Sequence, residues 1–454
     1  MANTYLTRTT STAGNGKTFT FSTWLKRSEN NTSEDPCLFC IGAGNSSQAD
    51  QFFFGFNDGG SSTDKLSIQQ YSGVPAIRTN KKFRDVNAWY HIVLTVDTTQ
   101  STASNRLKIF VNGVQETDLA AANYPTQNYS YALGLGTSKI FVVGGAYFSS
   151  FARYLNGSMS HVHYIDGTAY DASYFGETDA TTGEWKIKTS PSVTYGTNGF
   201  FILKDGNSVT DSSPNSNNFT VGGGTLTKTE DCPSNVFATL NPLDNFYAGG
   251  TFINGNNTIT TSNSTNNVTP LISTLGMSSG KYYAEIKYSA RTGADDYARI
   301  GVCASNASRP VNEGFEGMIT DHSYQGSDGA YSNNDTHNAG YGATYTVGDI
   351  IGISLDLDNG YIYFSKNGTY QNSGVPTSGS TGTGGKTVSL GVDYFFGVAD
   401  IDYNDSYTFQ CNFGNGYFGT TAVSSAGTNA SGIGIFEYDV PTGYTALSTK
   451  GLNL

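Results

Sequence analysis

Carboxylate pairs are the residues of this sequence that come nearest to catalytic chemistry. Asp356 and Asp358 share one face of an alternating segment, and Asp400 and Asp402 do the same later in the chain. Retaining glycoside hydrolysis needs two carboxyl groups about 5–5.5 Å apart, and residues i and i+2 of a strand lie on one face. Each pair runs into an Asn-containing turn, and no third acidic residue extends it along the same face. We therefore expect no catalytic residues and a chain that is not an enzyme.

The same four aspartates, Asp356, Asp358, Asp400 and Asp402, are candidate Ca²⁺ ligands. Calcium prefers carboxylate and carbonyl oxygens, which these segments offer at what would be the rim of a β-sandwich. Asx residues at turns also hydrogen-bond their own backbone without any ion, so both interpretations stay open. No nucleotide-binding glycine motif is present. The sequence thus predicts no organic cofactor and leaves Ca²⁺ as a candidate ion.

Two other pairs of potential metal ligands are incomplete. His161 and His163 lie on one face of an expected strand and would need a third ligand from elsewhere. Cys37 and Cys40 form a CxxC pair, but no second CxxC or HxxxH completes a zinc site. The apolar stretch CLFCI around them predicts the core of a strand, not redox or metal chemistry.

Tyrosine-rich polar segments are the stronger candidates for function. Residues 123–131 (NYPTQNYSY) and 321–345 (DHSYQGSDGAYSNNDTHNAGYGATY) combine Tyr with Asn, Ser and Gly. A Tyr ring offers a flat apolar face and a hydroxyl at low entropic cost, and the small polar residues add adaptable hydrogen bonds. Such a surface suits a sugar ring or a protein epitope, although the tyrosines could instead cap the fold or pack against neighbouring subunits. The candidate ligand-binding residues are Tyr124, Tyr129, Tyr131, His322, Tyr324, Tyr331, Asn334, Asp335 and Tyr341.

The elements that carry these residues are expected to be short β-strands. The 454 residues include 55 Gly, 30 Tyr and 27 Phe, and 14% are charged, so turn formers and aromatics outweigh helix formers. Apolar and polar residues alternate with period two at 19–25, 90–96 and 350–358. Asn-Gly pairs at 112–113 and 359–360 favour hairpin turns. The sequence therefore predicts an all-β fold.

The charge balance excludes one large class of partner. A formal net charge of −12 would repel a phosphate backbone, and the nearest thing to a basic cluster, 81–84, is followed by Asp85. No apolar run approaches the roughly 18 residues of a membrane-spanning helix, and no signal peptide precedes the first expected strand. We expect no nucleic-acid partner, no membrane insertion and synthesis in a cytoplasm.

Several motifs resemble known β-sandwich families. Three ordered segments resemble the laminin-G-like members of the concanavalin-A-like group: FTFSTWLKR (19–27), AWYHIVLTVD (88–97) and RLKIFVNGVQ (106–115). Four later segments resemble a SPRY domain: GKYYAEIKY (280–288), RIGVCAS (299–305), GDIIGISLDLDNGYIYFSKNG (348–368) and FFGVADIDYNDSYTFQCNFG (395–414). The resemblance implies two antiparallel jelly-roll sandwiches of the concanavalin-A-like kind, joined by a structured connector. We place the first sandwich at 1–172, a connector that could complete it at 173–245, and the SPRY-like sandwich with its C-terminal tail at 246–454.

The connector and the tail resemble segments of structural proteins of marine bacteriophages. The similar parts are 166–206, 211–223, 231–245 and 437–453. The resemblance implies a virion-surface tail-fibre or receptor-binding protein, made in the host cytoplasm, that forms a homotrimer, contacts other virion subunits and binds a host-surface glycan or protein. The alternatives are a head-decoration or architectural protein that binds other viral subunits, and a polysaccharide depolymerase. In the receptor-binding interpretation, deleting 324–338 would abolish cell binding and leave the fold intact.

Overall fold

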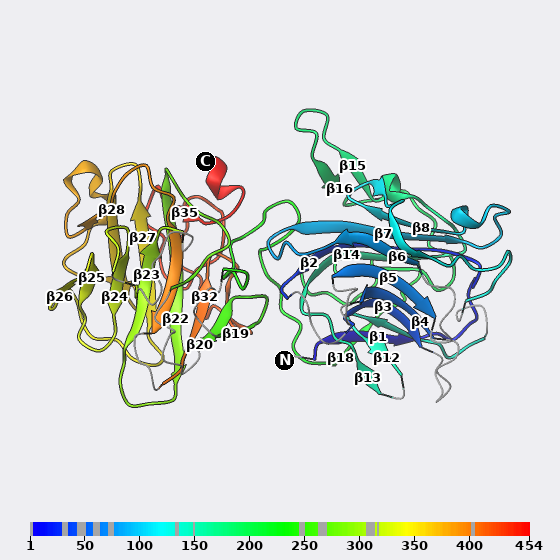
Figure 1. Cartoon of the computed structure of the whole chain (residues 1–454), viewed down its shortest axis with the longest axis horizontal. Helices are drawn as coiled ribbons and strands as arrows, with labels where there is room; N and C mark the ends of the chain where they lie inside the picture. The colour runs from blue at the N-terminus through cyan, green and yellow to red at the C-terminus, as the bar shows by residue number, and fades with distance from the viewer. Residues whose placement is uncertain are drawn as a thin grey trace. The chain divides into compact units, whose positions relative to one another are not determined.

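The structure, a computed structural model, is built almost entirely from β-strands. It describes residues 3–29, 35–42, 51–57, 64–70, 77–131, 136–148, 150–244, 250–261, 270–305, 314–315, 317–400 and 405–454. Short 3-10 helices occur at η2 (Ala103–Asn105), η4 (Ala172–Tyr174), η6 (Pro376–Thr381) and η7 (Gly451–Asn453). The chain divides into unit 1 (Met1–Lys228) and unit 2 (Thr229–Leu454), and Figure 1 labels strands of each. The all-β prediction is confirmed.

Unit 1 contains two large antiparallel sheets and two short hairpins (Figure 1). The eight-stranded sheet holds, in spatial order, β10 (Leu119–Ala122), β6 (Ile77–Lys82), β5 (Lys65–Gln70), β4 (Phe52–Asn57), β3 (Cys37–Gly42), β11 (Ile140–Val143), β1 (Tyr5–Thr9) and β18 (Thr220–Gly223). The six-stranded sheet holds β17 (Phe200–Ile202), β14 (Gly157–Asp166), β2 (Thr18–Arg27), β7 (Trp89–Asp97), β8 (Leu107–Val111) and β9 (Val114–Gln115). The hairpins are β12 (Ala146–Tyr147) with β13 (Phe151–Ala152), and β15 (Gly176–Thr178) with β16 (Trp185–Ile187).

The core of unit 1 follows the alternation of its strands. Phe19 and Phe21 of β2 lie opposite Val96 and Leu94 of β7, and all four side chains are buried in one cluster. Phe21 also stacks on Phe39 of β3 with ring centroids 4.7 Å apart, so the two sheets meet through their aromatic faces. Alternate apolar side chains of β2 and β7 thus face the core, as the period-two pattern of the sequence predicts, and the opposite face of both strands is buried as well.

Part of the expected connector belongs to unit 1. Strand β17 pairs with β14 and becomes the edge of the six-stranded sheet, while β18 pairs with β1 at the edge of the other sheet. The division between the units follows Lys228. The segment thus contributes one strand to each sheet of the first sandwich.

The segment after β14 also covers the outer face of the six-stranded sheet. Trp185 of the β15–β16 hairpin, which projects at the top of Figure 1, donates an Nε1–H hydrogen bond of 3.0 Å to Nδ1 of His91. Trp24 stacks on the same imidazole, with centroids 5.0 Å apart. Gly113 has φ +82°, and a Cβ there would come within 2.5 Å of the Trp185 ring. The Asn-Gly turn therefore makes both the hairpin and the space for Trp185. Burial lowers the pKa of His91 to about 3, so this ring is neutral and structural at physiological pH.

Unit 2 repeats the two-sheet plan with different strands. Its larger sheet holds, in spatial order, β19 (Gly250–Ile253), β20 (Thr258–Thr261), β32 (Tyr407–Asn412), β22 (Lys281–Arg291), β27 (Ile350–Asp356), β28 (Tyr361–Lys366) and β29 (Thr369–Tyr370), with β30 (Lys386–Thr387) beside β28 and β35 (Thr445–Ala446) beside β22. The six-stranded sheet holds β21 (Leu271–Ile272), β31 (Phe395–Asp400), β23 (Ala298–Cys303), β24 (His322–Gln325), β25 (Tyr331–Asn333) and β26 (Thr336–Asn338). A separate hairpin joins β33 (Tyr417–Phe418) to β34 (Thr421–Ala422).

A buried carboxylate attaches the C-terminal segment to the larger sheet of unit 2. Glu285 of β22 is fully buried. Its oxygens accept hydrogen bonds of 2.8 Å from the backbone N–H groups of Glu437 and Tyr438. The Tyr283 hydroxyl (3.1 Å) and the Asn412 amide (3.4 Å) donate to the same carboxylate. Burial raises the pKa of the Glu285 carboxyl to about 7, and the four donors oppose that rise.

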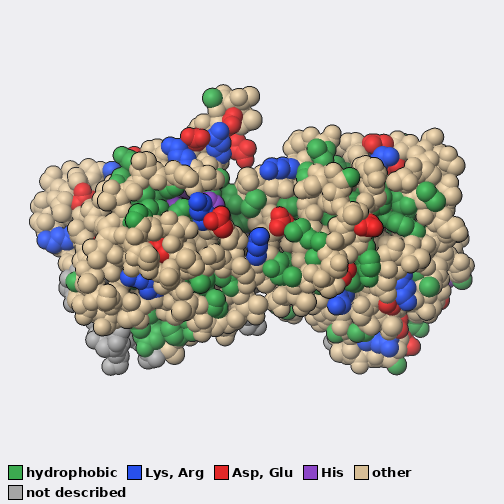
Figure 2. Space-filling view, turned by 180° about the vertical axis from the view of Figure 1, so that it is seen from behind, with side chains coloured by type: hydrophobic (Ala, Val, Ile, Leu, Met, Phe, Trp, Pro, Cys, Tyr) green, Lys and Arg blue, Asp and Glu red, His purple; other side chains and the backbone are tan. Residues whose placement is uncertain are grey.

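The face of the molecule that Figure 2 shows carries dispersed charge. Figure 2 shows basic side chains that lie singly or beside acidic ones, and a mixed group on the projecting hairpin. In that hairpin Lys186 pairs with Asp179 at 3.2 Å and with Glu177 at 3.6 Å. Among the described residues, no helix has the length and apolar character needed to cross a membrane.

Candidate functional site

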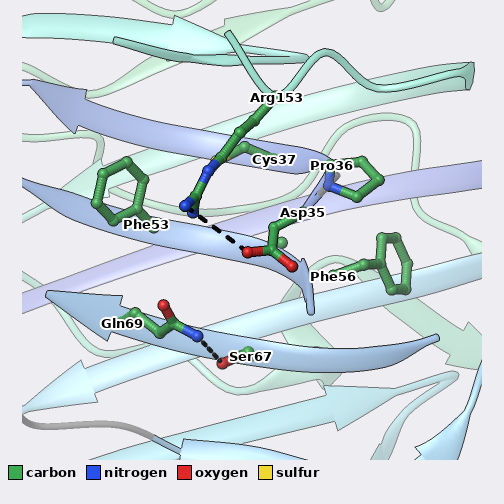
Figure 3. Close-up of a pocket in the computed structure, with 9 residues that line it drawn as sticks. Asp35, Pro36, Cys37, Phe53, Phe56, Ser67, Gln69 and Arg153 are labelled. Carbon is green, nitrogen blue, oxygen red and sulfur yellow. Dashed lines mark hydrogen bonds and ion pairs between the residues drawn. The ribbon is translucent and has the colours of Figure 1, made fainter. Parts of the chain in front are cut away.

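A small pocket lies on the outer face of the eight-stranded sheet of unit 1 (Figure 3). It measures about 250 Å³, part of which is open to solvent. Side chains from the start of β3, from β4 and β5, and from the segment after β13 form it. Its lining residues are Asp35, Pro36, Cys37, Phe53, Gly55, Phe56, Ser67, Gln69 and Arg153. The pocket thus gathers three strands and one loop.

A β-bulge in β3 shapes the floor of this pocket. The pairing of β3 with β4 shifts register between Cys37 and Phe39, which leaves an extra residue in β3. Cys37, Cys40 and Phe53 consequently belong to an outer cluster that is separate from the core. Gly55 lies opposite the bulge, and a Cβ there would come within 2.3 Å of the Pro36 carbonyl oxygen. A larger residue at position 55 would push the start of β3 away from β4.

The two cysteines in this cluster have unreactive, neutral thiols. The Cys37 thiol donates to the Phe39 carbonyl oxygen at 3.2 Å, and both cysteines are buried and free. Burial raises the pKa of Cys37 to about 12, and that of Cys40 well above its ordinary value. Neutral thiols are neither nucleophiles nor good metal ligands, so the arrangement agrees with the interpretation as strand core.

Arg153 supplies the positive charge of the pocket. Its guanidinium carbon lies 4.8 Å from the Phe148 ring centroid and 5.5 Å from that of Phe53, so the group is held by two cation–π contacts. Its Nη2 lies 3.7 Å from Oδ2 of Asp35 (Figure 3). The Arg153 carbonyl oxygen accepts a 2.9 Å hydrogen bond from the Cys37 backbone N–H, which fixes the loop to β3. Donor and acceptor groups therefore stand side by side at the rim.

The polar wall of the pocket comes from β5. Leu66 and Ile68 face the core, so Ser67 and Gln69 face outward between them. The Gln69 Nε2 donates to the Ser67 Oγ at 3.2 Å. Together with the rim, these side chains can hydrogen-bond a polar ligand, and they offer no pair of acidic groups for acid–base catalysis.

The candidate binding residues of unit 2 lie in a different environment from the one the sequence suggests. Tyr324, Tyr331 and Tyr341 are buried members of the core, and Tyr324 donates its hydroxyl hydrogen to the Ala343 carbonyl oxygen. His322 is buried as well, with its Nδ1 2.7 Å from the Tyr331 hydroxyl oxygen. These rings fill the space between the sheets and are not exposed to a ligand. The sequence interpretation that the tyrosines cap the fold describes them better.

Two members of the candidate set in unit 2 are exposed. Asn334 and Asp335 form the turn between β25 and β26, with φ of +50° and +55°. Asn and Asp tolerate this left-handed conformation, so turn geometry alone accounts for both residue types.

Residues 322–325 and 331–333 form β24 and β25 of the six-stranded sheet. The expectation that 324–338 can be deleted with the fold intact is therefore wrong, because the deletion removes strands.

The tyrosine-rich segment of unit 1 shows the same pattern. Tyr131 is buried in the core, where it meets Phe52 with ring centroids 5.2 Å apart. Tyr124 and Tyr129 are partly buried and pack against that core. Tyr129 and Tyr131 form an edge-to-face pair at 5.0 Å. The Tyr131 ring therefore belongs to the core of the sandwich, and ligand binding by this group remains a prediction.

The candidate calcium ligands that the structure describes have protein partners. Asp356 pairs with Lys281 at 3.0 Å and accepts hydrogen bonds from the backbone N–H groups of Asp358 and Asn359. Asp358 accepts from the Gly280 N–H at 2.9 Å. The Asp400 side chain and Asp402 lie outside the described residues. Turn formation and an ammonium partner thus explain the first pair without an ion.

The two neighbouring histidines do share a face. The rings of His161 and His163 lie against Phe201, with centroids 5.5 and 3.9 Å from it. Nδ1 of His163 lies 3.0 Å from the Tyr195 hydroxyl oxygen, and burial lowers the pKa of His161 to about 4. No group of three or more His, Cys, Asp or Glu residues suited to a metal ion occurs in the described part of the chain. The two histidine rings therefore pack against an aromatic side chain.

Comparisons with known proteins divide the chain in the same way. Residues 1–168 match the family described as the concanavalin A-like lectin/glucanases superfamily, and residues 281–386 match the SPRY domain family. Ran-binding protein 9 of Danio rerio is 33% identical over 89 residues, which cover 20% of this chain and only 14% of that protein.

Solved structures of low identity also resemble parts of the chain. The SPRY domain of human HERC1 is 16% identical over 36% of this chain and 93% of that structure, with a TM-score of 0.28. The heptameric SAP-like pentraxin of Limulus polyphemus is 14% identical over 37% of this chain and 72% of that structure, with a TM-score of 0.27. The family matches and the two β-sandwich units agree: the chain combines a laminin-G-like domain of the concanavalin-A-like superfamily with a SPRY domain.

Proposed function

We propose that the chain is a non-catalytic structural protein of a bacteriophage virion, a tail-fibre or receptor-binding component that binds a host-surface glycan or protein. Both of its domains are of kinds that bind carbohydrates or proteins. The connector and tail resemble virion proteins, which supports a place on the virion surface, assembly as a homotrimer and contact with other virion subunits. Binding, not turnover, is the activity proposed.

The observation that carries the proposal is the outer-face pocket of unit 1. It sets a guanidinium, a carboxylate and an amide within one small depression that opens to solvent. Such a group can orient a polar ligand through several hydrogen bonds at once. The buried tyrosines of unit 2 do not offer an equivalent surface.

Binding of the labelled, purified chain to host cells tests this function. We expect saturable binding to cells that the virus infects, and loss of that binding after periodate oxidation of surface sugars if the receptor is a glycan. Mock-oxidised cells and a resistant strain are the controls. Retained binding after oxidation would indicate a protein receptor. Absence of binding to a susceptible host would contradict the proposal and favour the head-decoration alternative, which a much higher copy number per virion would support.

A further inference from the structure

The Arg153 side chain is held in place before any ligand arrives. Its guanidinium lies against the rings of Phe148 and Phe53, and its carbonyl oxygen is tied to the Cys37 N–H. The backbone of Arg153 has φ +55°, a conformation that costs a non-glycine residue energy and that is enriched at binding sites. About a third of the side chain, 31%, is exposed. The site therefore presents a fixed cation with little rotamer entropy left to lose.

The hydrogen-bonding capacity of this cation is largely unused within the described residues. A guanidinium has five N–H donors, and the contact to Asp35 at 3.7 Å is too long for a hydrogen bond. Asp35 is 26% exposed and provides carboxylate oxygens as acceptors next to those donors. Gln69 adds an amide oxygen and a second donor on the opposite wall. Donor and acceptor groups thus line the same opening.

The neighbouring Asp35 decides which polar ligand this arrangement fits. A carboxylate or sulfate ligand would be attracted by Arg153 and repelled by Asp35 at a similar distance, so the two effects would largely cancel. A pair of adjacent hydroxyl groups has no net charge and can accept from the guanidinium while donating to the carboxylate. Resting on the function proposed above, we propose that the Arg153–Asp35 pocket binds the vicinal hydroxyls of a neutral sugar and discriminates against acidic sugars.

The size of the pocket sets the expected affinity. The depression is shallow and open on one side, so a sugar would contact it only through hydroxyl groups at one edge of the ring. A ligand held by a few hydrogen bonds on an open surface binds weakly, so a single site should have a dissociation constant on the order of millimolar. Several copies on one virion would raise the effective affinity by about 10²–10⁴-fold without further contacts.

Ligand-detected NMR titration of the full chain with a neutral methyl hexoside and with the matching hexuronic acid tests the inference. We expect the wild-type chain to prefer the neutral sugar. Arg153→Gln should weaken neutral-sugar binding at least tenfold, and Arg153→Lys should fail to restore it because the ammonium lacks the planar fork. Lys17→Gln makes the same charge change at an exposed residue outside the pocket and should leave binding unchanged.

Asp35→Asn gives the sharpest outcome, since it removes the repulsion and one acceptor together. It should weaken neutral-sugar binding and strengthen uronate binding, which reverses the preference. Trp24, Trp89 and Trp185 all lie in unit 1, so tryptophan fluorescence verifies that each variant is folded. A wild-type preference for the uronate, or unchanged binding by Arg153→Gln, would overturn the inference. Cell binding that survives in Arg153→Gln would leave the proposed function standing and refute only this pocket, whereas absence of cell binding by the wild type would refute the function itself.

Discussion

Replacing Glu285 by alanine is expected to lower the free energy of unfolding of unit 2 by about 3 kcal/mol. The variant leaves the Glu437 and Tyr438 N–H groups without their acceptor, and an unsatisfied buried donor costs about 1–3 kcal/mol. The loss is reduced because burial of the carboxyl is itself unfavourable, as the raised pKa of Glu285 records. The segment around Phe436, which packs on Tyr283 with ring centroids 5.0 Å apart, should separate from the sheet first.

Hydrogen-exchange mass spectrometry of the whole chain measures this effect by region. Peptides that cover β22 and residues 435–440 should lose protection in Glu285→Ala, while the tryptophan-monitored unfolding of unit 1 should not move, since all three Trp residues lie there. Unchanged protection at 435–440 would mean that the carboxylate does not hold the C-terminal segment.

The pH dependence of the stability of unit 2 provides a second test of the role of Glu285. Because the folded pKa of about 7 exceeds the ordinary 4.5, Glu285 binds its proton more tightly in the folded state. Its stabilising contribution is complete below about pH 4.5 and is lost as pH rises through 7, a total of about 3 kcal/mol. Glu285→Gln cannot titrate and should lack this component. Equal pH dependence in the wild type and in Glu285→Gln would contradict the assignment.

Asp64→Asn should destabilise unit 1 by about 3–5 kcal/mol, because it removes a negative charge from beside a buried arginine. Arg27 and Asp64 are both 1% exposed and lie 3.0 Å apart. Arg27 also donates to the Phe83 carbonyl oxygen at 2.8 Å and lies 4.0 Å from the Phe56 ring centroid, so it cannot easily move to solvent. Asparagine tolerates the φ of +63° at this position, which isolates the effect of the charge.

Denaturant unfolding followed by tryptophan fluorescence reports this change in unit 1. Arg84→Gln is the matched control, because Arg84 contacts the same carboxylate at 2.8 Å but is 56% exposed. Exposed ion pairs contribute about 0.2–1 kcal/mol to stability, so the denaturation midpoint of Arg84→Gln should shift only slightly. Similar shifts in the two variants would show that burial does not set the strength of the Arg27–Asp64 pair.

The strands were predictable where one face meets the core. Phe409, Cys411 and Phe413 alternate in the sequence and share the core of unit 2, as period-two patterning requires. The turn at Asn367-Gly368 has positive φ at both residues, as the residue pair favours, whereas in Asn359-Gly360 only the glycine does. The residues within each strand or turn were therefore enough to predict the buried face of the strand and the position of the turn.

The covered outer face of the six-stranded sheet was not predictable in this way. Thr20 and Ser22 of β2 have the polar character of solvent-facing residues, yet both are buried. The residues that cover this face, such as Phe175 and Trp185, come from a segment that lies far along the chain. Alternation within a strand carries no information about a distant segment that packs on it.

The residues of the proposed binding pocket were the least predictable part. A tyrosine has the same sequence signature whether it caps a core, as Tyr324 does, or contacts a ligand. Arg153 and Asp35 are 118 positions apart and meet only because the segment after β13 returns to the start of β3. No local motif marks either residue. The one local sequence feature near them is the Asp35-Pro36 pair, and a residue that precedes proline indicates the boundary of a strand, not a binding site.

Competition for virus adsorption tests the central claim most directly. Host cells are saturated with the purified chain, and the adsorption rate of the bacteriophage proposed to carry it is then measured. Receptor binding predicts that wild-type protein slows adsorption, that Arg153→Gln at the same concentration does so much less, and that Lys17→Gln matches the wild type. An adsorption rate that saturating wild-type protein leaves unchanged would contradict a receptor-binding role.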